Sequence, residues 1–302
     1  MTDFLLLPLL GGIWTLVSVI VIRAREAGVP AVVFYFAGTS VSTVLCGLAL
    51  FLSGMGPSGL SAPGARAVLW CFAAASLLNA SGQAVTMYNL KSGGRALAVA
   101  IPQLSFLFPF FCAMLFWGEA ADFLRILGVA VIAFAVFLSS YGSPKKDVPG
   151  QWNLKRLGFS LITVVLAGMS QTTLVMSAHL YGSPVSGMLK TFVYIVTAAL
   201  FFGVLTLFEI RKTGFPSLRK LKFGGLWGIV ATGSNLMLFH CVDLFTRRGQ
   251  SGIVYAVACA SLMVFIMLYT RFRLGEKLTP LQNLSALGMI AGVLMVRLGG
   301  GS

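Results

Sequence analysis

Ten apolar runs, each close to the length that crosses a bilayer, account for most of the sequence. They lie at roughly 4–22, 31–53, 67–88, 96–117, 123–141, 157–178, 186–208, 223–243, 252–270 and 279–298. A transmembrane helix needs about 20 apolar residues to cross the hydrocarbon core of a membrane. The runs lack the alternation of polar and apolar residues that marks the strands of a membrane barrel. The pattern therefore predicts an all-α integral membrane protein with ten transmembrane helices.

Charged residues are too scarce for a soluble protein of this length. They make up 10% of the 302 residues, and the mean hydropathy is +0.92, whereas soluble domains carry about 25% charged residues. The net charge of +14 could suggest nucleic acid as a partner. The basic residues, however, lie in short loops between apolar runs and form no basic domain. We therefore expect the lipid bilayer, and not nucleic acid, as the partner of this charge.

The distribution of Lys and Arg predicts the orientation in the membrane. Of the 22 Lys and Arg residues, Lys190 lies inside a run. If the N-terminus is outside, five of the others lie in outer loops and the remaining 16 in inner loops. Because basic loops stay on the cytoplasmic side, the sequence predicts a multi-pass protein of the inner (plasma) membrane with both termini outside.

The two halves of the chain match when one is shifted by 157 residues. Glu119 then falls on Glu276 and Trp70 on Trp227, each within a similar local sequence. Each half holds five runs, an odd number, so the second half must enter the membrane from the opposite face. The sequence therefore predicts two inverted five-helix repeats, an architecture found in many secondary transporters.

The repeat divides the chain into four parts. We expect the first five-helix repeat at 1–141, a basic inter-repeat loop at 142–156 and the second five-helix repeat at 157–298. The last residues, 299–302, have the composition of a cloning scar and are left out of the repeats.

Two Gly-Glu motifs carry a resemblance to a known family. They read GEAADFLRILG at 118–128 and GEKLTPLQNLSALGMIAGVLMV at 275–296, and each leads into the last apolar run of its half. With its runs arranged as five plus five, the chain resembles the drug/metabolite transporter superfamily of the EamA type. The resemblance covers essentially the whole chain and implies movement of a small polar metabolite through a central cavity by alternating access. Many members have both termini in the cytoplasm, whereas the charges here predict the reverse.

Glu119 and Glu276 occupy equivalent positions in the two halves. Each precedes a helix, where a carboxylate meets the positive end of the helix dipole and can accept hydrogen bonds from free N–H groups. We therefore expect both to stabilise the start of the helix that follows and to take no part in proton transfer. The other acidic residues also lie near the ends of runs, which argues against a transporter of organic cations.

Polar stripes on two runs are candidates for the wall of a substrate cavity. Their residues are spaced as on one face of a helix. They are Tyr35, Thr39 and Ser42 in the second run and Lys190, Tyr194 and Thr197 in the seventh. Lys190 either lines the cavity, which would favour an anionic substrate, or extends its flexible stem to the membrane surface.

Amide and aromatic side chains inside other runs complete the candidate site. An amide is costly to bury unless it faces water or hydrogen-bonds to another helix, and both explanations remain open here. An aromatic ring either stacks on a substrate or packs on its neighbours. The predicted substrate-binding residues are Trp14, Tyr35, Thr39, Asn79, Gln83, Gln103, Gln171, Lys190, Tyr194, Asn235 and Tyr255.

No catalytic motif stands out in the sequence. HExxH, a phosphate-binding P-loop and paired buried carboxylates are all missing, and His179 and His240 are not at ligand spacing. We therefore expect no enzyme activity, no cofactor and no metal.

These patterns lead to one main hypothesis and two alternatives. The main one is a secondary transporter, working as a monomer, whose repeats rock about a midplane site to move a small polar or zwitterionic metabolite, with amino acids the first choice. Its drive would be the substrate gradient or exchange. One alternative is a carrier of anionic metabolites such as sugar phosphates or nucleotide derivatives, although phosphate usually binds several basic groups. The other is a membrane scaffold that transports nothing.

Overall fold

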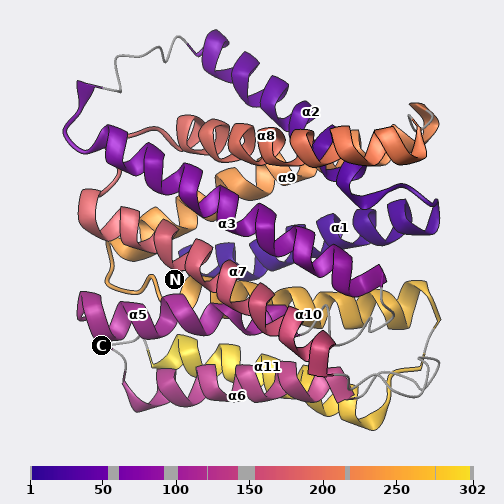
Figure 1. The fold of residues 1–302 in the computed structure, drawn as a ribbon. Helices are drawn as coiled ribbons and strands as arrows, with labels where there is room; N and C mark the ends of the chain where they lie inside the picture. Colours follow the sequence, from indigo (N-terminus) through magenta and orange to yellow (C-terminus); the bar gives the residue numbers. More distant parts are fainter. Residues whose placement is uncertain are drawn as a thin grey trace.

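The computed structural model describes residues 2–53, 61–91, 101–120, 122–141, 154–214, 218–275 and 277–299. Within these ranges the chain is helical, with short turns and no strand, which confirms the predicted all-α class. The elements are η1 (Thr2–Leu5), α1 (Leu6–Glu26), α2 (Ala31–Leu52), α3 (Ala65–Lys91), η3 (Ile101–Phe106), α5 (Leu107–Trp117), α6 (Phe123–Tyr141), α7 (Leu154–Tyr181), α8 (Gly187–Thr213), α9 (Leu218–Thr246), α10 (Ile253–Arg273) and α11 (Pro280–Leu298). Figure 1 shows them as a bundle of helices that run mostly side by side.

Eight of the described helices are long and apolar enough to cross a membrane. They are Thr2–Glu26, Ala31–Leu52, Ala65–Asn89, Leu157–Tyr181, Gly187–Lys212, Leu221–Thr246, Ile253–Arg273 and Pro280–Leu298. Two shorter apolar segments, Ile101–Trp117 and Phe123–Ser139, lie between the third and fourth of these. The chain is therefore a multi-pass membrane protein by the length and composition of its helices, while the count of ten spans stays a prediction.

The segment expected to form the fourth span is less regular than the sequence pattern indicates. A run was expected at 96–117, but residues 92–100 lie outside the described ones and η3 precedes α5. Pro102 falls inside η3 and Pro109 near the start of α5. Proline donates no backbone N–H and its ring clashes with the preceding turn of an α-helix, so a tighter 3-10 turn fits here.

Local chemistry sets several helix ends. The Thr279 side chain accepts from the backbone of Gln282, and the Gln282 side chain accepts from the backbone of Thr279, which makes a capping box at the start of α11. The Ser186 hydroxyl accepts from Leu189 N at the start of α8. At the end of α5, Gly118 has φ of +65°, a conformation that favours glycine and stops the helix.

The helices pack in a defined set of neighbours. α1 packs against α9 and α10, α2 against α8 and α9, and α3 against α7 and α8, while α6 packs against α11. In Figure 1, α2 and α8 lie at one edge of the bundle and α6 and α11 at the other. The interior between these edges is formed by α1, α3, α7, α9 and α10.

Small residues bring α6 and α11 into close contact. A Cβ at Gly128 would lie 2.8 Å from the Gly292 carbonyl oxygen, and a Cβ at Gly292 would lie 2.7 Å from that of Gly128. One end of the same pair is joined by Ser285 Oγ, which donates to the Ala135 carbonyl oxygen at 2.6 Å. Close backbone packing of small residues is a common way for helices to associate in lipid, where burial of apolar surface gives little drive.

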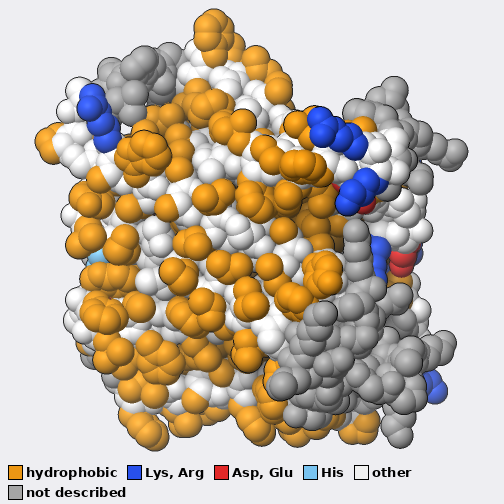
Figure 2. Space-filling view, viewed as in Figure 1, with side chains coloured by type: hydrophobic (Ala, Val, Ile, Leu, Met, Phe, Trp, Pro, Cys, Tyr) orange, Lys and Arg blue, Asp and Glu red, His pale blue; other side chains and the backbone are white. Residues whose placement is uncertain are grey.

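The outer surface is apolar along most of the length of the helices. Large hydrophobic side chains such as Phe51, Trp70 and Phe116 are exposed there. Figure 2 shows a broad hydrophobic face, with Lys and Arg gathered toward the ends of the helices. A surface of this kind suits the hydrocarbon core of a bilayer, with basic groups at the level of the headgroups.

The two ends of the chain lie at the same end of the bundle (Figure 1). The Arg297 guanidinium lies 5.7 Å from the centroid of the Phe4 ring. Asp3 pairs with Arg248 in the turn between α9 and α10, which places that turn beside the N-terminus. Gly299 ends α11 and donates its N–H to the Met295 carbonyl oxygen, and the tail after it lies outside the described residues.

Candidate functional site

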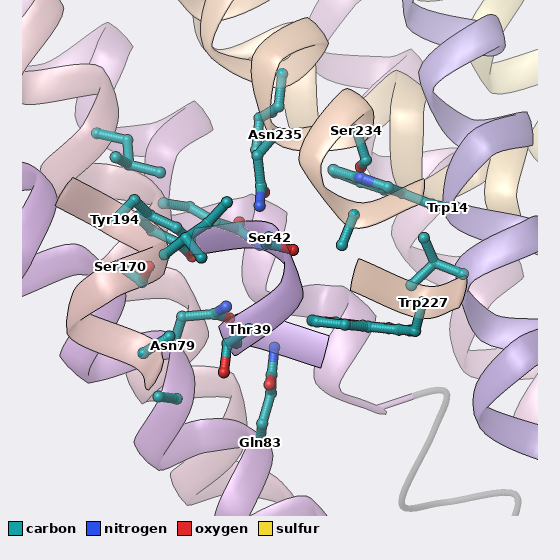
Figure 3. A pocket seen from close by; sticks show the side chains of 18 of the residues that line it. Trp14, Thr39, Ser42, Asn79, Gln83, Ser170, Tyr194, Trp227, Ser234 and Asn235 are labelled. Carbon is teal, nitrogen blue, oxygen red and sulfur yellow. The ribbon is translucent and has the colours of Figure 1, made fainter. Parts of the chain in front are cut away.

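A cavity of about 310 Å³ lies in the middle of the bundle. Side chains from α1, α2, α3, η3, α7, α8, α9 and α10 line it, whereas the α6–α11 pair contributes none. Figure 3 shows the amide ends of Asn79, Gln83 and Asn235 turned toward the same space, with the Trp227 ring at its side. We call this space the central cavity.

The central cavity brings together most of the residues predicted to bind substrate. Nine of the eleven candidates line it, although they come from eight different elements. These nine are Trp14, Thr39, Asn79, Gln83, Gln103, Gln171, Tyr194, Asn235 and Tyr255. Part of each polar stripe and the isolated amides of the sequence therefore meet at one place, and this convergence is a property of the fold that no single stripe shows.

The other two candidates, Tyr35 and Lys190, lie elsewhere. Tyr35 lines a second pocket and stacks on Phe202, with ring centroids 5.2 Å apart and the planes 17° from parallel. Its ring also meets Trp227 edge-on at 5.2 Å. Tyr35 thus packs against the ring of Trp227 and does not line the central cavity.

Lys190 neither lines the central cavity nor reaches the membrane surface. Its side chain is 1% exposed, and Nζ donates to both carboxylate oxygens of Asp243, at 2.9 and 2.6 Å. A third contact runs to Ser183 Oγ at 3.4 Å, and Nζ lies 5.6 Å from the centroid of the Phe72 ring. The lysine charge is therefore compensated inside the protein, which removes the reason to expect an anionic substrate.

Several serines around the cavity bond to neighbouring helices. Ser42 Oγ donates to the Gly228 carbonyl oxygen and Ser170 Oγ to that of Ala75, both at 2.7 Å. Ser76 Oγ donates likewise to the Tyr194 carbonyl oxygen at 2.5 Å. These hydroxyls hold the walls together, as the helix–helix explanation expects.

Trp227 lines the central cavity, although its position in an apolar run gave no polar signal. Glycines near Trp227 in sequence and across the helix contact explain its position. A Cβ at Gly224 would lie 2.9 Å from the Phe34 carbonyl oxygen, and one at Gly38 would collide with the Trp227 ring. α2 and α9 therefore cross closely, and Trp227 lies at this crossing, where it lines the cavity.

A second pocket of about 230 Å³ adjoins the central cavity at Gln83, which lines both. It is lined by residues near the end of α1, the start of α2 and the end of α3, including Val29, Thr86 and Met87. Arg25, which is exposed, also lines it. The two spaces together lead from the middle of the bundle to one of its ends, which we call the open end.

The opposite end of the bundle carries a cluster of polar contacts around Glu119. Its Oε1 accepts from Ser251 N at 2.8 Å and from Ser251 Oγ at 2.5 Å, and its Oε2 accepts from Gly252 N at 3.1 Å. His179 Nε2 lies 3.1 Å from Glu119 Oε1 and 3.0 Å from Ser251 Oγ. Trp117 stacks on the His179 ring, with centroids 4.8 Å apart. We call these residues the Glu119 cluster.

The expectation that Glu119 stabilises the start of the following helix is wrong. Its carboxylate binds free N–H groups at the start of α10, whereas the start of α6 is served by Asp122, whose Oδ1 accepts from Arg125 N at 2.9 Å. The Arg125 guanidinium in turn donates to the Ala120 carbonyl oxygen. The general reason was right, because a carboxylate does meet a helix N-terminus, but the helix belongs to another part of the chain. Glu276 lies outside the described residues.

The Lys190–Asp243 pair lies at the same end as the Glu119 cluster. Lys190 is in the first turn of α8 and Asp243 in the last turn of α9, and these helix ends adjoin His179 and Ser251 along the chain. The exposed pair of Asp3 and Arg248 joins η1 to this end as well. We call it the closed end, since none of these charged residues lines either of the two pockets.

Comparisons with known proteins give the fold without a function. No protein-family model matches the chain, and no curated protein matches it. A solved structure described only as "Crystal structure of protein" matches with a TM-score of 0.77 over 99% of this chain and 99% of that one, at 12% identity. At that identity the likeness shows a shared arrangement of helices over the whole length and no more.

Proposed function

We propose that this protein is a secondary transporter that moves a small polar metabolite across the membrane by alternating access. The observation that carries the proposal is the central cavity. It is polar, it lies within an apolar helical bundle, and it extends to the open end while charged groups join the helices at the closed end. Polar side chains inside a membrane protein are costly, and they characteristically mark the path of a substrate.

The proposal includes ten spans arranged as two inverted five-helix repeats. Under the 157-residue shift, α1 corresponds to α7, α2 to α8, α3 to α9, η3 with α5 to α10, and α6 to α11. The observed packing pairs follow this exchange. α1 packs on α9 and α10, and α7 packs on α3 and on η3 with α5; α2 packs on α9, and α8 on α3. Such paired contacts are expected of a pseudo-two-fold arrangement.

Close approaches at single residues support the same arrangement. Gly11 and Gly168 lie 157 residues apart, and a Cβ at either would collide with a facing helix, at Ser261 and Phe108 respectively. Contacts between α6 and α11 follow the same 157-residue shift. The two small-residue contacts, Gly128 with Gly292 and Ala135 with Ser285, exchange under the shift.

Membership of the drug/metabolite transporter superfamily, an inner-membrane location and both termini outside are parts of the same proposal. The charge distribution supports the orientation, because the open end holds basic residues such as Arg23 and Arg25 in the last turn of α1. In this orientation the cavity opens to the cytoplasm. No described contact favours the scaffold alternative over transport.

Counter-flow in proteoliposomes tests the proposal. Vesicles with the purified protein are loaded with an unlabelled compound and exposed to a trace of the labelled one, across a panel of amino acids, nucleobases, nucleosides and sugar phosphates. We expect at least one compound to accumulate transiently. Ala231→Trp, which fills the cavity wall, should abolish the signal, whereas Ala130→Trp on the exposed face of α6 should leave it intact. Absence of exchange for the whole panel by folded protein would contradict transport.

A further inference from the structure

We propose that the substrate is an uncharged planar heterocycle with amide-type donor and acceptor groups at its edge, of the size of a nucleobase or nicotinamide. This inference rests on the proposed transport function and narrows it, since it separates neutral rings from amino acids and from phosphates. It is carried by the charge, the unpaired polar atoms and the aromatic faces of the central cavity.

The first step is the charge of the lining. Among the described residues that line the central cavity, none is Asp, Glu, Lys, Arg or His. An ion placed in such a space would lose its hydration without gaining a counter-charge, which disfavours its binding. Lys190, the basic residue that the sequence offered as a counter-charge, is paired with Asp243 at the closed end. A zwitterion would face the same cost at both of its charges.

The second step is the set of buried polar atoms that lack a partner within the described chain. Three of them belong to side chains that line the central cavity: Trp227 Nε1, Tyr255 Oη and Gln171 Oε1. Trp227 is 9% exposed and Tyr255 2%, so neither is satisfied at the protein surface. The Gln171 amide already donates from Nε2 to Ser105 Oγ at 2.9 Å, which leaves its oxygen to accept from something else.

These three atoms define a complementary ligand. The indole N–H can only donate, so it needs an acceptor, and the Gln171 oxygen can only accept, so it needs a donor. The Tyr255 hydroxyl can do either. A neutral ring with an adjacent C=O and N–H supplies both functions without a formal charge. Leaving such buried groups unpaired is unfavourable, so binding of a ligand or water that pairs them is favoured.

The third step is the shape of the walls. Trp14 stacks on Tyr255 with ring centroids 6.5 Å apart and planes 29° from parallel, and Trp227 and Tyr194 line the same space. Aromatic faces bind planar rings by stacking and apolar contact. A cavity of about 310 Å³ is at the small end of ligand pockets, which favours one or two rings.

Two pairs of compounds that differ in charge test the inference: nicotinamide and nicotinate have nearly the same shape, and orotate is uracil with an added carboxylate. Counter-flow is measured with nicotinamide against nicotinate, and with uracil against orotate, with tryptophan and uridine monophosphate in the same panel. We expect exchange of nicotinamide or uracil at a rate at least tenfold above that of its carboxylate partner. Quenching of tryptophan fluorescence in the purified protein gives the corresponding binding constants independently of flux.

Two variants connect that preference to named atoms. Trp227→Phe and Tyr255→Phe each remove one unpaired polar group while they keep an aromatic ring. Each should weaken binding of the preferred neutral compound roughly three- to tenfold, the effect of one neutral hydrogen bond. The matched controls are Trp70→Phe and Tyr88→Phe on the exposed surface, which should change nothing. Trp70 is also the residue that corresponds to Trp227 in the other half of the sequence.

The outcomes separate the two proposals. Faster exchange of nicotinate, orotate or tryptophan than of the neutral compounds would overturn the substrate class and leave transport standing. Equal binding by the Trp227 and Tyr255 variants would overturn the assignment to these atoms. Neither exchange nor quenching with any compound of the panel would overturn transport and the substrate class together.

Discussion

The two ends of the bundle are held by different kinds of contact. At the closed end, Lys190 is paired with Asp243, and Glu119 binds the start of α10 through charge-assisted hydrogen bonds. At the open end, the second pocket is lined mostly by uncharged side chains such as Val29 and Thr86. Apolar contacts weaken gradually as helices slide, whereas a buried ion pair cannot be separated without leaving an uncompensated charge.

This difference bears on how such a molecule could alternate between two states. A contact that must be lost completely, and replaced by water, defines two discrete arrangements and no continuum between them. The closed end has the properties of such a contact because its partners come from separate helices. At the open end, a described bond between helices joins neutral groups, with Asn89 Nδ2 donating to Ser160 Oγ at 2.9 Å. In the proposed cycle, the main energetic cost of changing from one state to the other therefore lies at the closed end.

The strongest test of this contrast is removal of the charge on Asp243. Asp243→Asn should lower the free energy of unfolding by about 3–5 kcal/mol, because it leaves the Lys190 ammonium buried without a counter-charge. The measurement is unfolding of the purified protein in detergent, followed by circular dichroism.

Two further variants separate the charge effect from loss of packing. The double variant Lys190→Met, Asp243→Leu should recover most of the lost stability, since replacing a buried ion pair with apolar residues is often neutral or better. Asp3→Asn breaks the exposed pair with Arg248 and should cost at most about 1 kcal/mol. If Asp3→Asn were as harmful as Asp243→Asn, burial of the pair would not be the cause.

The next effect in size is expected at Glu119. Glu119→Gln keeps the shape of the side chain but removes the charge that strengthens its bonds to Ser251 and Gly252, which should cost about 1.5–3 kcal/mol. It should also loosen the closed end. A cysteine at Val185, placed in a variant without native cysteines, should react faster with a membrane-impermeant maleimide when Glu119→Gln is present. A cysteine at Thr86 should react at the same rate with or without it.

Much of the fold was accessible from the sequence, because apolar length and turn residues act locally. The eight long apolar helices match eight of the predicted runs, and nine predicted residues meet at one cavity. The partners of the charged residues were not accessible. Lys190 and Asp243 are 53 positions apart, and Glu119 and Ser251 are 132 apart. Periodicity reports which face of a helix is polar, but it does not report which helix end that face will meet.

A smaller effect is expected at His179. Its imidazole touches both Glu119 and Ser251, and its ring stacks on Trp117. His179→Phe keeps the stacked ring and removes both contacts of Nε2. Because these share one nitrogen, we expect a loss of about 1 kcal/mol, the net value of a typical hydrogen bond. Chemical denaturation in the same detergent measures it. Combined with Glu119→Gln, the two losses should be less than additive, because both variants act on the same contact between His179 and Glu119. Full additivity would mean that His179 acts apart from the Glu119 cluster.

The smallest change in the free energy of unfolding is expected for a substitution at the open end. Thr86 Oγ1 donates to the Gly82 carbonyl oxygen one turn earlier at 3.0 Å, and lies 3.4 Å from Thr163 Oγ1. Thr86→Val keeps the shape of the side chain and removes a local bond, so the free energy of unfolding should change by less than about 0.5 kcal/mol. The reactivity of a cysteine at Val185 should not change either, since nothing at the closed end depends on this hydroxyl. A loss of stability as large as that of Glu119→Gln would mean that polar contacts stabilise both ends to the same degree. The contrast between the closed end and the open end would then have to be abandoned.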